Sequence, residues 1–246
     1  MQWLLIFIAG TVAGAQNALA GGGSFVTLGM LVIAGLDPRA ANITSTMALF
    51  AGQAATGYAG RGMVSGAEGL SFKKLFIISL AGGVAGALLL LATPPTFFAG
   101  LVPWLVLFAT AVFFWGSFLR RPSEGVRTLS PLTAGAAQFA IAIYGGYFGG
   151  GIGFLMLAVL TVAGLPVRAA SATKNALAVA MNASAVLIFM FSSDVHWLHA
   201  AVLGAGGITG GLAGVWLLPR VNERLLRIVV IVIGIVLTIG LFMRGR

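Results

Sequence analysis

The chain has 246 residues, of which 59% are hydrophobic and only 8% are charged, against roughly 45–50% and 25% in ordinary soluble domains. Together with a mean hydropathy of +1.06, this composition disfavours a soluble enzyme, a nucleic-acid-binding domain and a disordered chain. It favours a polytopic helical membrane protein. The net charge of +9 comes from Lys and Arg residues scattered between apolar segments, which is typical of loops between membrane spans rather than of a nucleic-acid-binding face.

The segments that we expect to form helices follow one another at 3–34, 43–60, 72–92, 101–119, 132–163, 171–191, 197–217 and 224–243. The shorter ones each suit one crossing of a hydrocarbon layer about 30 Å thick. The runs 3–34 and 132–163 are too long for one crossing, and glycines interrupt both of them. Because consecutive glycines destabilise a helix, we predict that each long run forms a helix, a break and a shorter helix.

The second half of the chain repeats the first at an offset of 129 residues. GGGSFVTLGMLVIAGL at 21–36 matches GGIGFLMLAVLTVAGL at 150–165, and the match continues to Arg39 and Arg168. We therefore predict one membrane domain over residues 1–246, in which repeat one spans 1–121, a polar linker spans 122–127 and repeat two spans 128–246.

The distribution of Lys and Arg indicates how the long runs cross the membrane. Eight simple spans divide these residues 8 against 5, whereas re-entrant hairpins at both long runs divide them 10 against 3, with Lys174 left inside a span. The positive-inside rule favours the hairpins. Each repeat then has one glycine-broken hairpin and three transmembrane helices, and this odd number of crossings inverts the second repeat. The expected fold is all-α with two inverted repeats, a recurrent plan of secondary transporters; eight simple spans are the alternative.

Polar side chains recur at helical spacing after each glycine break. They are Asn42, Thr46 and Gln53 in the first half and Ser171, Asn175 and Asn182 in the second, all related by the same offset. Residues at these spacings share one helix face, so we expect them to line one central site. The alternative is hydrogen bonding between packed helices.

Apart from Lys73, Lys74, Arg224 and Arg227 at the ends of their spans, which we count with the loops, Lys174 is the one basic residue inside an expected span. No Asp or Glu lies inside any expected span. An intramembrane lysine is a candidate functional residue, although its side chain also has the length to extend to the membrane interface. The helices after the breaks begin at Gly22, Gly23, Ser24 and Phe25 and at Gly151 and Gly153. Free N–H groups at such helix ends attract anions, so these residues and Lys174 predict an anion site.

Other polar and glycine residues have simpler expected roles. Asn17 precedes the first break, and we expect it to satisfy backbone groups that the glycines free. The glycines at 82, 83, 86, 206, 207, 210 and 211 are expected to allow close helix packing. We interpret Asp194, His196 and His199 as a polar loop rather than as a weak metal site. We predict no catalytic residue, no metal ligand and no cofactor, because an intramembrane enzyme needs a base or an acid inside a span.

The duplicated glycine motif, the following turns (Gly35-Leu36-Asp37-Pro38 and Gly164-Leu165-Pro166) and Thr44 and Thr173 resemble the sulfite exporter TauE/SafE family of bacterial membrane transporters. The resemblance covers essentially the whole chain. It implies a multi-pass protein of the bacterial inner membrane that exports sulfite or a small organosulfonate. Alternating access between the two repeats is the expected mechanism, with an anion channel or a carrier of another small solute as alternatives. The expected partners are the anion, the lipid bilayer and, as an alternative to a monomer, a second copy of the chain as a homodimer; nucleic acid is not expected.

Overall fold

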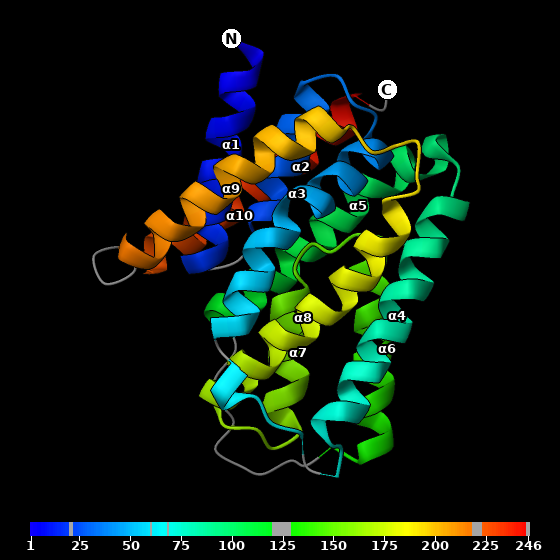
Figure 1. The fold of residues 1–246 in the computed structure, drawn as a ribbon, viewed down its shortest axis with the longest axis vertical. Helices are drawn as coiled ribbons and strands as arrows, with labels where there is room; N and C mark the ends of the chain where they lie inside the picture. Colours follow the sequence, from blue (N-terminus) through cyan, green and yellow to red (C-terminus); the bar gives the residue numbers. More distant parts are fainter. Residues whose placement is uncertain (20–21, 60, 68, 120–128, 218–222, 245–246) are drawn as a thin grey trace.

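The computed structural model describes residues 1–19, 22–59, 61–67, 69–119, 129–217 and 223–244. Ten α-helices account for most of these residues (Figure 1). In chain order they are α1 (Gln2–Leu19), α2 (Gly23–Ile33), α3 (Pro38–Ala59), α4 (Phe72–Ala92), α5 (Pro95–Phe114), α6 (Pro131–Tyr147), α7 (Ile152–Val162), α8 (Val167–Phe189), α9 (Trp197–Leu217) and α10 (Glu223–Arg244). A short 3-10 helix (Arg61–Met63) follows α3, and one π-helical turn (Trp115–Leu119) extends α5. The predicted linker at 122–127 lies outside the described residues.

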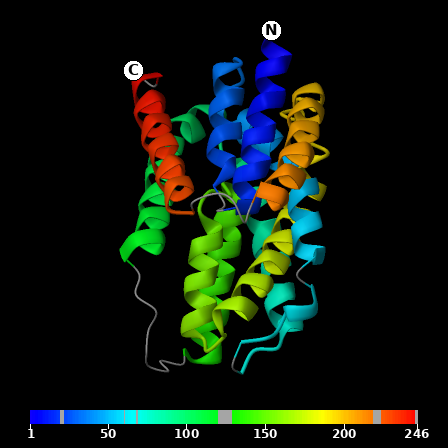
Figure 2. The ribbon, with the colours of Figure 1, turned by 90° about the vertical axis from the view of Figure 1, so that its left-hand side faces the viewer.

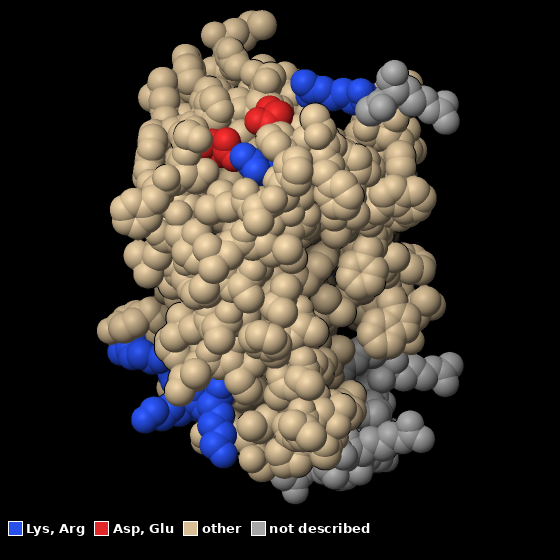
Figure 3. Space-filling model, turned by 90° about the vertical axis from the view of Figure 1, so that its right-hand side faces the viewer, with Lys and Arg blue, Asp and Glu red and all other residues tan. Residues whose placement is uncertain are grey.

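Several of the helices have the length and surface of membrane spans. Among the described residues, four stretches are long and apolar enough to cross a bilayer, namely Phe72–Ala92, Pro95–Leu119, Ala169–Phe189 and Arg227–Arg244. Large apolar side chains such as Leu88, Trp104 and Val236 are exposed on α4, α5 and α10. On the face drawn in Figure 3, a wide band without charged side chains separates the basic residues at the lower end from the charged residues near the upper end. These features are those of an all-helical polytopic membrane protein.

Both long apolar runs are broken at their glycines, as predicted. Gly22 precedes α2 with φ 83° and Gly151 precedes α7 with φ 75°. These backbone angles lie in the left-handed region that side chains disfavour, which explains why glycine occupies both positions. The chain reverses at each break, so that α1 packs on α2 and α6 packs on α7. Figure 2 shows the first hairpin in the upper half of the molecule and the second in the lower half, with both turns near mid-height.

Helices from the two halves of the chain pack against each other across glycines. Helix α1 lies along α9, and α6 lies along α4. A Cβ atom added at Gly210 would lie 2.6 Å from the carbonyl carbon of Thr11, and one added at Gly86 would lie 2.8 Å from the nitrogen of Tyr147. Such distances are well inside van der Waals contact, so only glycine permits these helices to approach as they do.

The predicted packing role is confirmed for most of the glycines, whereas at two of them the structure leaves room for a side chain. The backbone of a neighbouring helix lies against those at 82, 83, 86, 206 and 210. A Cβ atom added at Gly207 or Gly211, in contrast, would have its nearest neighbour at 3.8 Å or 4.0 Å. Both residues border a cavity, so a side chain at either position has room, although the backbone of Gly207 still lies against Gly14 of α1.

Candidate functional site

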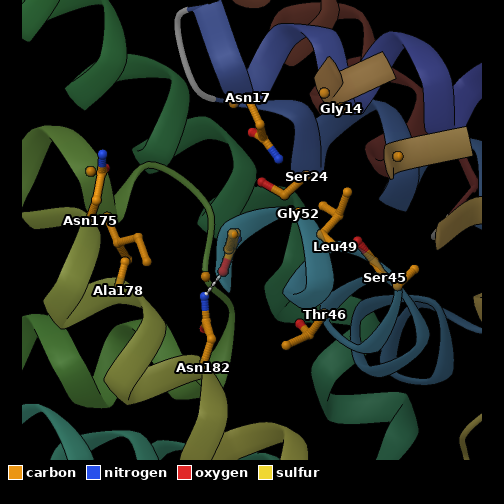
Figure 4. Close-up of a pocket in the computed structure, with 18 of the residues that line it drawn as sticks. Gly14, Asn17, Ser24, Ser45, Thr46, Leu49, Gly52, Asn175, Ala178 and Asn182 are labelled. Carbon is orange, nitrogen blue, oxygen red and sulfur yellow. Dashed lines mark hydrogen bonds between the residues drawn. The ribbon is translucent and has the colours of Figure 1, made fainter. Parts of the chain in front are cut away.

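A cavity of about 470 Å³ lies among helices from both halves of the chain. Its walls come from α1, α2, α3, α5, α7, α8 and α9 and from the turn between α6 and α7, and Figure 4 shows ten of the lining residues labelled. The volume is within the range of about 300–1,000 Å³ that small-molecule sites occupy. Both glycine breaks contribute to the walls, through Gly22 and through Gly149 and Gly151.

Most of the residues predicted from the sequence for the anion site border this cavity. They are Gly22, Ser24, Asn42, Thr46, Gln53, Gly151, Gly153, Lys174, Asn175 and Asn182. The other three, Gly23, Phe25 and Ser171, do not line it. Phe25 is only 1% exposed in the apolar core, and Ser171 lies one turn before Asn175 on α8.

Lys174 is the one charged side chain among the described residues that line the cavity. Its ammonium group lies beside the first turn of α7, since a Cβ atom added at Gly153 would be 3.7 Å from its Nζ. No hydrogen bond or ion pair joins Lys174 to another residue in the described part of the chain. A helix N-terminus carries a partial positive charge, so two positive groups converge here without a described acid beside them. An anion in the cavity would be attracted to both.

The two helix N-termini at the breaks differ in how their backbone is satisfied. In the first half, the N–H of Gly23 donates to Oδ1 of Asn17 over 2.8 Å, which confirms the role expected for Asn17. The residue at the matching position of the second half is Gly146, which has no side chain to cap α7. Helix α7 accordingly starts without a side-chain cap from its N-cap residue, Gly151.

Several of the polar residues at the cavity hydrogen-bond to the protein itself. Nδ2 of Asn42 donates to the carbonyl oxygen of Tyr147 over 3.1 Å, and the hydroxyl of Thr46 donates to the carbonyl oxygen of Asn42 over 3.0 Å. Nδ2 of Asn182 donates to Oε1 of Gln53, and Figure 4 marks this bond with a dashed line. The alternative of interhelical hydrogen bonding therefore applies to Asn42, Gln53 and Asn182, although all three border the cavity.

Several residues that line the cavity were not predicted from the sequence. Ser45 borders the cavity, as do aromatic and aliphatic side chains that include Phe113, Phe148, Phe154 and Leu212. In an apolar chain nothing local distinguishes a phenylalanine that faces a cavity from one in the core. The pairing of Ser45 with Lys174 at an offset of 129 was the available signal for that residue.

The model of the family described as sulfite exporter TauE/SafE matches residues 6–241. The chain belongs to this family. Among curated relatives, the chain is 30% identical to a probable membrane transporter protein, ORF9, of Sinorhizobium sp., over 96% of this chain and 90% of the relative. It is 27% identical to the probable membrane transporter protein YfcA of Escherichia coli K12, over 95% and 87%. No solved structure matches the chain. The protein is therefore a membrane transporter of the TauE/SafE family.

One end of this TauE/SafE protein is held together by Arg39, at the start of α3. Its guanidinium group lies 2.6 Å from Oδ2 of Asp194 in the loop between α8 and α9. It also donates to the carbonyl oxygens of Leu91 and Thr93, at 3.3 Å and 2.7 Å, at the end of α4. Both charged side chains are largely buried, with 15% and 20% of their surface exposed. Arg39 thus joins three segments from the two halves of the chain.

The loop that contains Asp194 also carries both histidines. The rings of His196 and His199 lie 5.5 Å apart, and the carboxylate of Asp194 is engaged by Arg39. Across the described residues, no group of three His, Cys, Asp or Glu side chains is placed to hold a metal ion. The arrangement gives this loop a role in the TauE/SafE fold as a connection between α3 and α9.

Proposed function

We propose that the protein exports a small anion, sulfite or an organosulfonate, across the bacterial inner membrane by alternating access at the cavity. The observation that carries the proposal is Lys174, an ammonium group without a partner among the described residues, beside the uncapped N-terminus of α7. Residues from both halves of the chain line the cavity, so a substrate bound there would contact both halves. The family description supports sulfite as one candidate anion.

The arrangement of the helices supports two inverted repeats. The hairpins α1–α2 and α6–α7 lie in opposite halves of the molecule (Figure 2), and each packs on a helix of the other half of the chain. The hydroxyl of Thr44 accepts from the N–H of His196, and the hydroxyl of Thr173 accepts from the N–H of Ser65. In both cases the threonine reaches the loop before a helix of the other half. Two structurally similar halves in opposite orientations can exchange conformations, which alternates access to a site between them.

The absence of an acidic side chain among the described lining residues bears on the driving force. A carboxylate-based proton or sodium site has no described group to use at the cavity. A membrane potential of 100 mV, negative inside, favours the exit of one negative charge by about 2.3 kcal/mol, or roughly fiftyfold. We therefore propose electrogenic uniport, in which the potential alone drives export.

Flux measurements in proteoliposomes test this proposal. Sulfite and ethanesulfonate efflux should follow a potential imposed with potassium and valinomycin, and it should persist without pH or sodium gradients. Saturable flux with counterflow distinguishes a carrier from a channel, which would give ohmic single-channel currents. Flux that ignored the potential and required a proton or sodium gradient would refute uniport. No anion flux under any gradient would refute the function.

A further inference from the structure

The N-termini of α2 and α7 occupy matching positions in the two halves of the chain, but they differ in their hydrogen bonds. At the start of α2, in the first half of the chain, Oδ1 of Asn17 accepts a hydrogen bond from the N–H of Gly23 over 2.8 Å. The matching residue of the second half, Gly146, packs directly on the backbone of Gly83 and leaves no room for a side chain. The start of α7 therefore keeps one backbone donor, the N–H of Ile152, whose counterpart at Gly23 is used within the protein.

The positions of Ser45 and Lys174 show the same asymmetry. Ser45 is hydrogen-bonded to Thr27 of α2, with 2.6 Å between the two hydroxyls. At the corresponding positions of the second half, Lys174 faces α7, in which Met156 replaces Thr27. A thioether is only a weak acceptor, so it does not hold the ammonium group as Thr27 holds Ser45. The first pair ties α3 to α2, whereas the second leaves a cation available to a ligand.

The remaining walls of the cavity are neutral. Asn42 and Thr46 hydrogen-bond within the protein, and Gln53 pairs with Asn182. The other described lining residues are small, aliphatic, aromatic or uncharged polar groups. A second anionic group in the cavity would meet no described cation, and burying an unpaired charge is costly.

The size of the cavity indicates what accompanies the charged group. A sulfonate or sulfite group has four non-hydrogen atoms and occupies the space of roughly two or three water molecules, each about 30 Å³. The cavity measures about 470 Å³, so one such group fills only a fraction of it. The rings of Phe113, Phe148 and Phe154 offer an apolar surface for the rest of a larger ligand.

We infer that the cavity binds an organic anion with a single charged group, held by Lys174 and the first turn of α7, while neutral residues from both halves of the chain supply the subsite for the remainder. The inference rests on the proposed function and narrows it. It assigns the anion-binding role to one half of the duplicated site, and it selects singly charged organic anions over those charged at both ends.

Ethanesulfonate and 1,2-ethanedisulfonate test the charge count, because they share a two-carbon skeleton and differ in one sulfonate. Their affinities for the purified full chain follow from thermal shifts during titration at constant ionic strength. We expect the disulfonate to bind at least tenfold more weakly. Equal or tighter binding of the disulfonate would overturn the single-charge inference, and this comparison needs no variant.

Variants test the position of the charged group. Lys174→Met, which keeps most of the length of the side chain and removes its charge, should weaken ethanesulfonate binding at least tenfold. Lys73→Met, which removes an exposed charge at the start of α4, should leave it unchanged. Ser24→Lys adds a cation on α2 and should raise the affinity for 1,2-ethanedisulfonate at least tenfold. Wild-type ethanesulfonate affinity in folded Lys174→Met would overturn the assignment of the subsite.

The outcomes also separate this inference from the proposed function. If wild-type protein transports sulfite but does not bind ethanesulfonate, the inference is wrong and anion export stands. If wild-type protein neither binds nor transports any of these anions, the proposed function itself is wrong.

Discussion

The close contact between α1 and α9 leads to a quantitative prediction about the adjacent residues Gly210 and Gly211. A Cβ atom added at Gly210 would lie 2.6 Å from the carbonyl carbon and 2.7 Å from the Cα of Thr11. Carbon atoms in contact prefer a separation of about 3.5–4.0 Å, so Gly210→Ala must push the two helices apart by about 1 Å. At Gly211, the nearest atom to an added Cβ is the carbonyl oxygen of Gly14, at 4.0 Å, and nothing has to move.

The two variants should therefore change stability in opposite directions. Overpacking a close contact costs about 1–3 kcal/mol, and at Gly210 it outweighs the gain of up to about 1 kcal/mol that alanine offers over glycine inside a helix. At Gly211 the helix-propensity gain acts alone. The propensity gain is common to both variants, so we expect Gly210→Ala to be less stable than Gly211→Ala by the overpacking cost, about 1–3 kcal/mol.

Thermal unfolding of both variants and the wild type in the same detergent provides the measurement. For a chain of this size, 1 kcal/mol corresponds to about 2–4 °C in Tm, so the two variants should differ by at least about 2 °C. Gly210→Ala should lie below the wild type and Gly211→Ala at or above it. Equal Tm values for the two variants would refute the close approach of α1 and α9 at Gly210.

Three further predictions concern the sides of the membrane, the ion pair and the cavity. Because the chain lacks cysteine, single cysteines introduced at Arg61 and Thr96 can be labelled without background. The cysteine at position 61 should react only from the cytoplasm and the one at position 96 only from outside, and reaction of both from one side would contradict the topology. Arg39→Met should lower Tm more than Asp194→Asn, since Arg39 also donates to two carbonyl oxygens; each loss should be about 1–3 kcal/mol, between the values for exposed and buried pairs, and the reverse order would count against the bridging role. Lys174→Ala should weaken anion binding at least tenfold, about 1.4 kcal/mol, and Lys174→Glu should abolish it; tenfold or smaller effects in Lys174→Glu would argue against direct contact with the anion.

The sequence alone sufficed to determine the features that depend on local chemistry. Glycine triplets inside runs too long for one crossing predicted a break, and the reversals at Gly22 and Gly151 confirm it. Glycine pairs such as Gly82-Gly83 stay helical, so it is the triplet together with the length of the run that carries the prediction. Helical spacing determines which side chains share a face of one helix, which is why Asn42 and Thr46 were predicted together and both border the cavity. A lysine inside an apolar segment is likewise recognised from the sequence alone as a candidate functional residue, whatever its neighbours in the folded protein are.

Which residues face each other was decided only by the tertiary structure. Periodicity sets the angle of a side chain around its own helix, but it does not set the partner, which comes from segments more than a hundred residues away. Thus Gln53 and Asn182, predicted as equivalent positions of two separate stripes, hydrogen-bond to each other. No sequence pattern relates Arg39 to Asp194, yet the two residues form an ion pair between the two halves of the chain.

The same reason explains the difference between the two halves of the cavity. From the sequence, the glycine breaks predict two similar helix ends that both attract an anion. Only the packing of α1 on α2 brings Asn17 to the N–H of Gly23, and only the packing of α6 on α4 requires a glycine at the matching position, 146. One N–H at the start of α2 is thereby satisfied within the protein, and the matching N–H of Ile152 at the start of α7 stays available near Lys174.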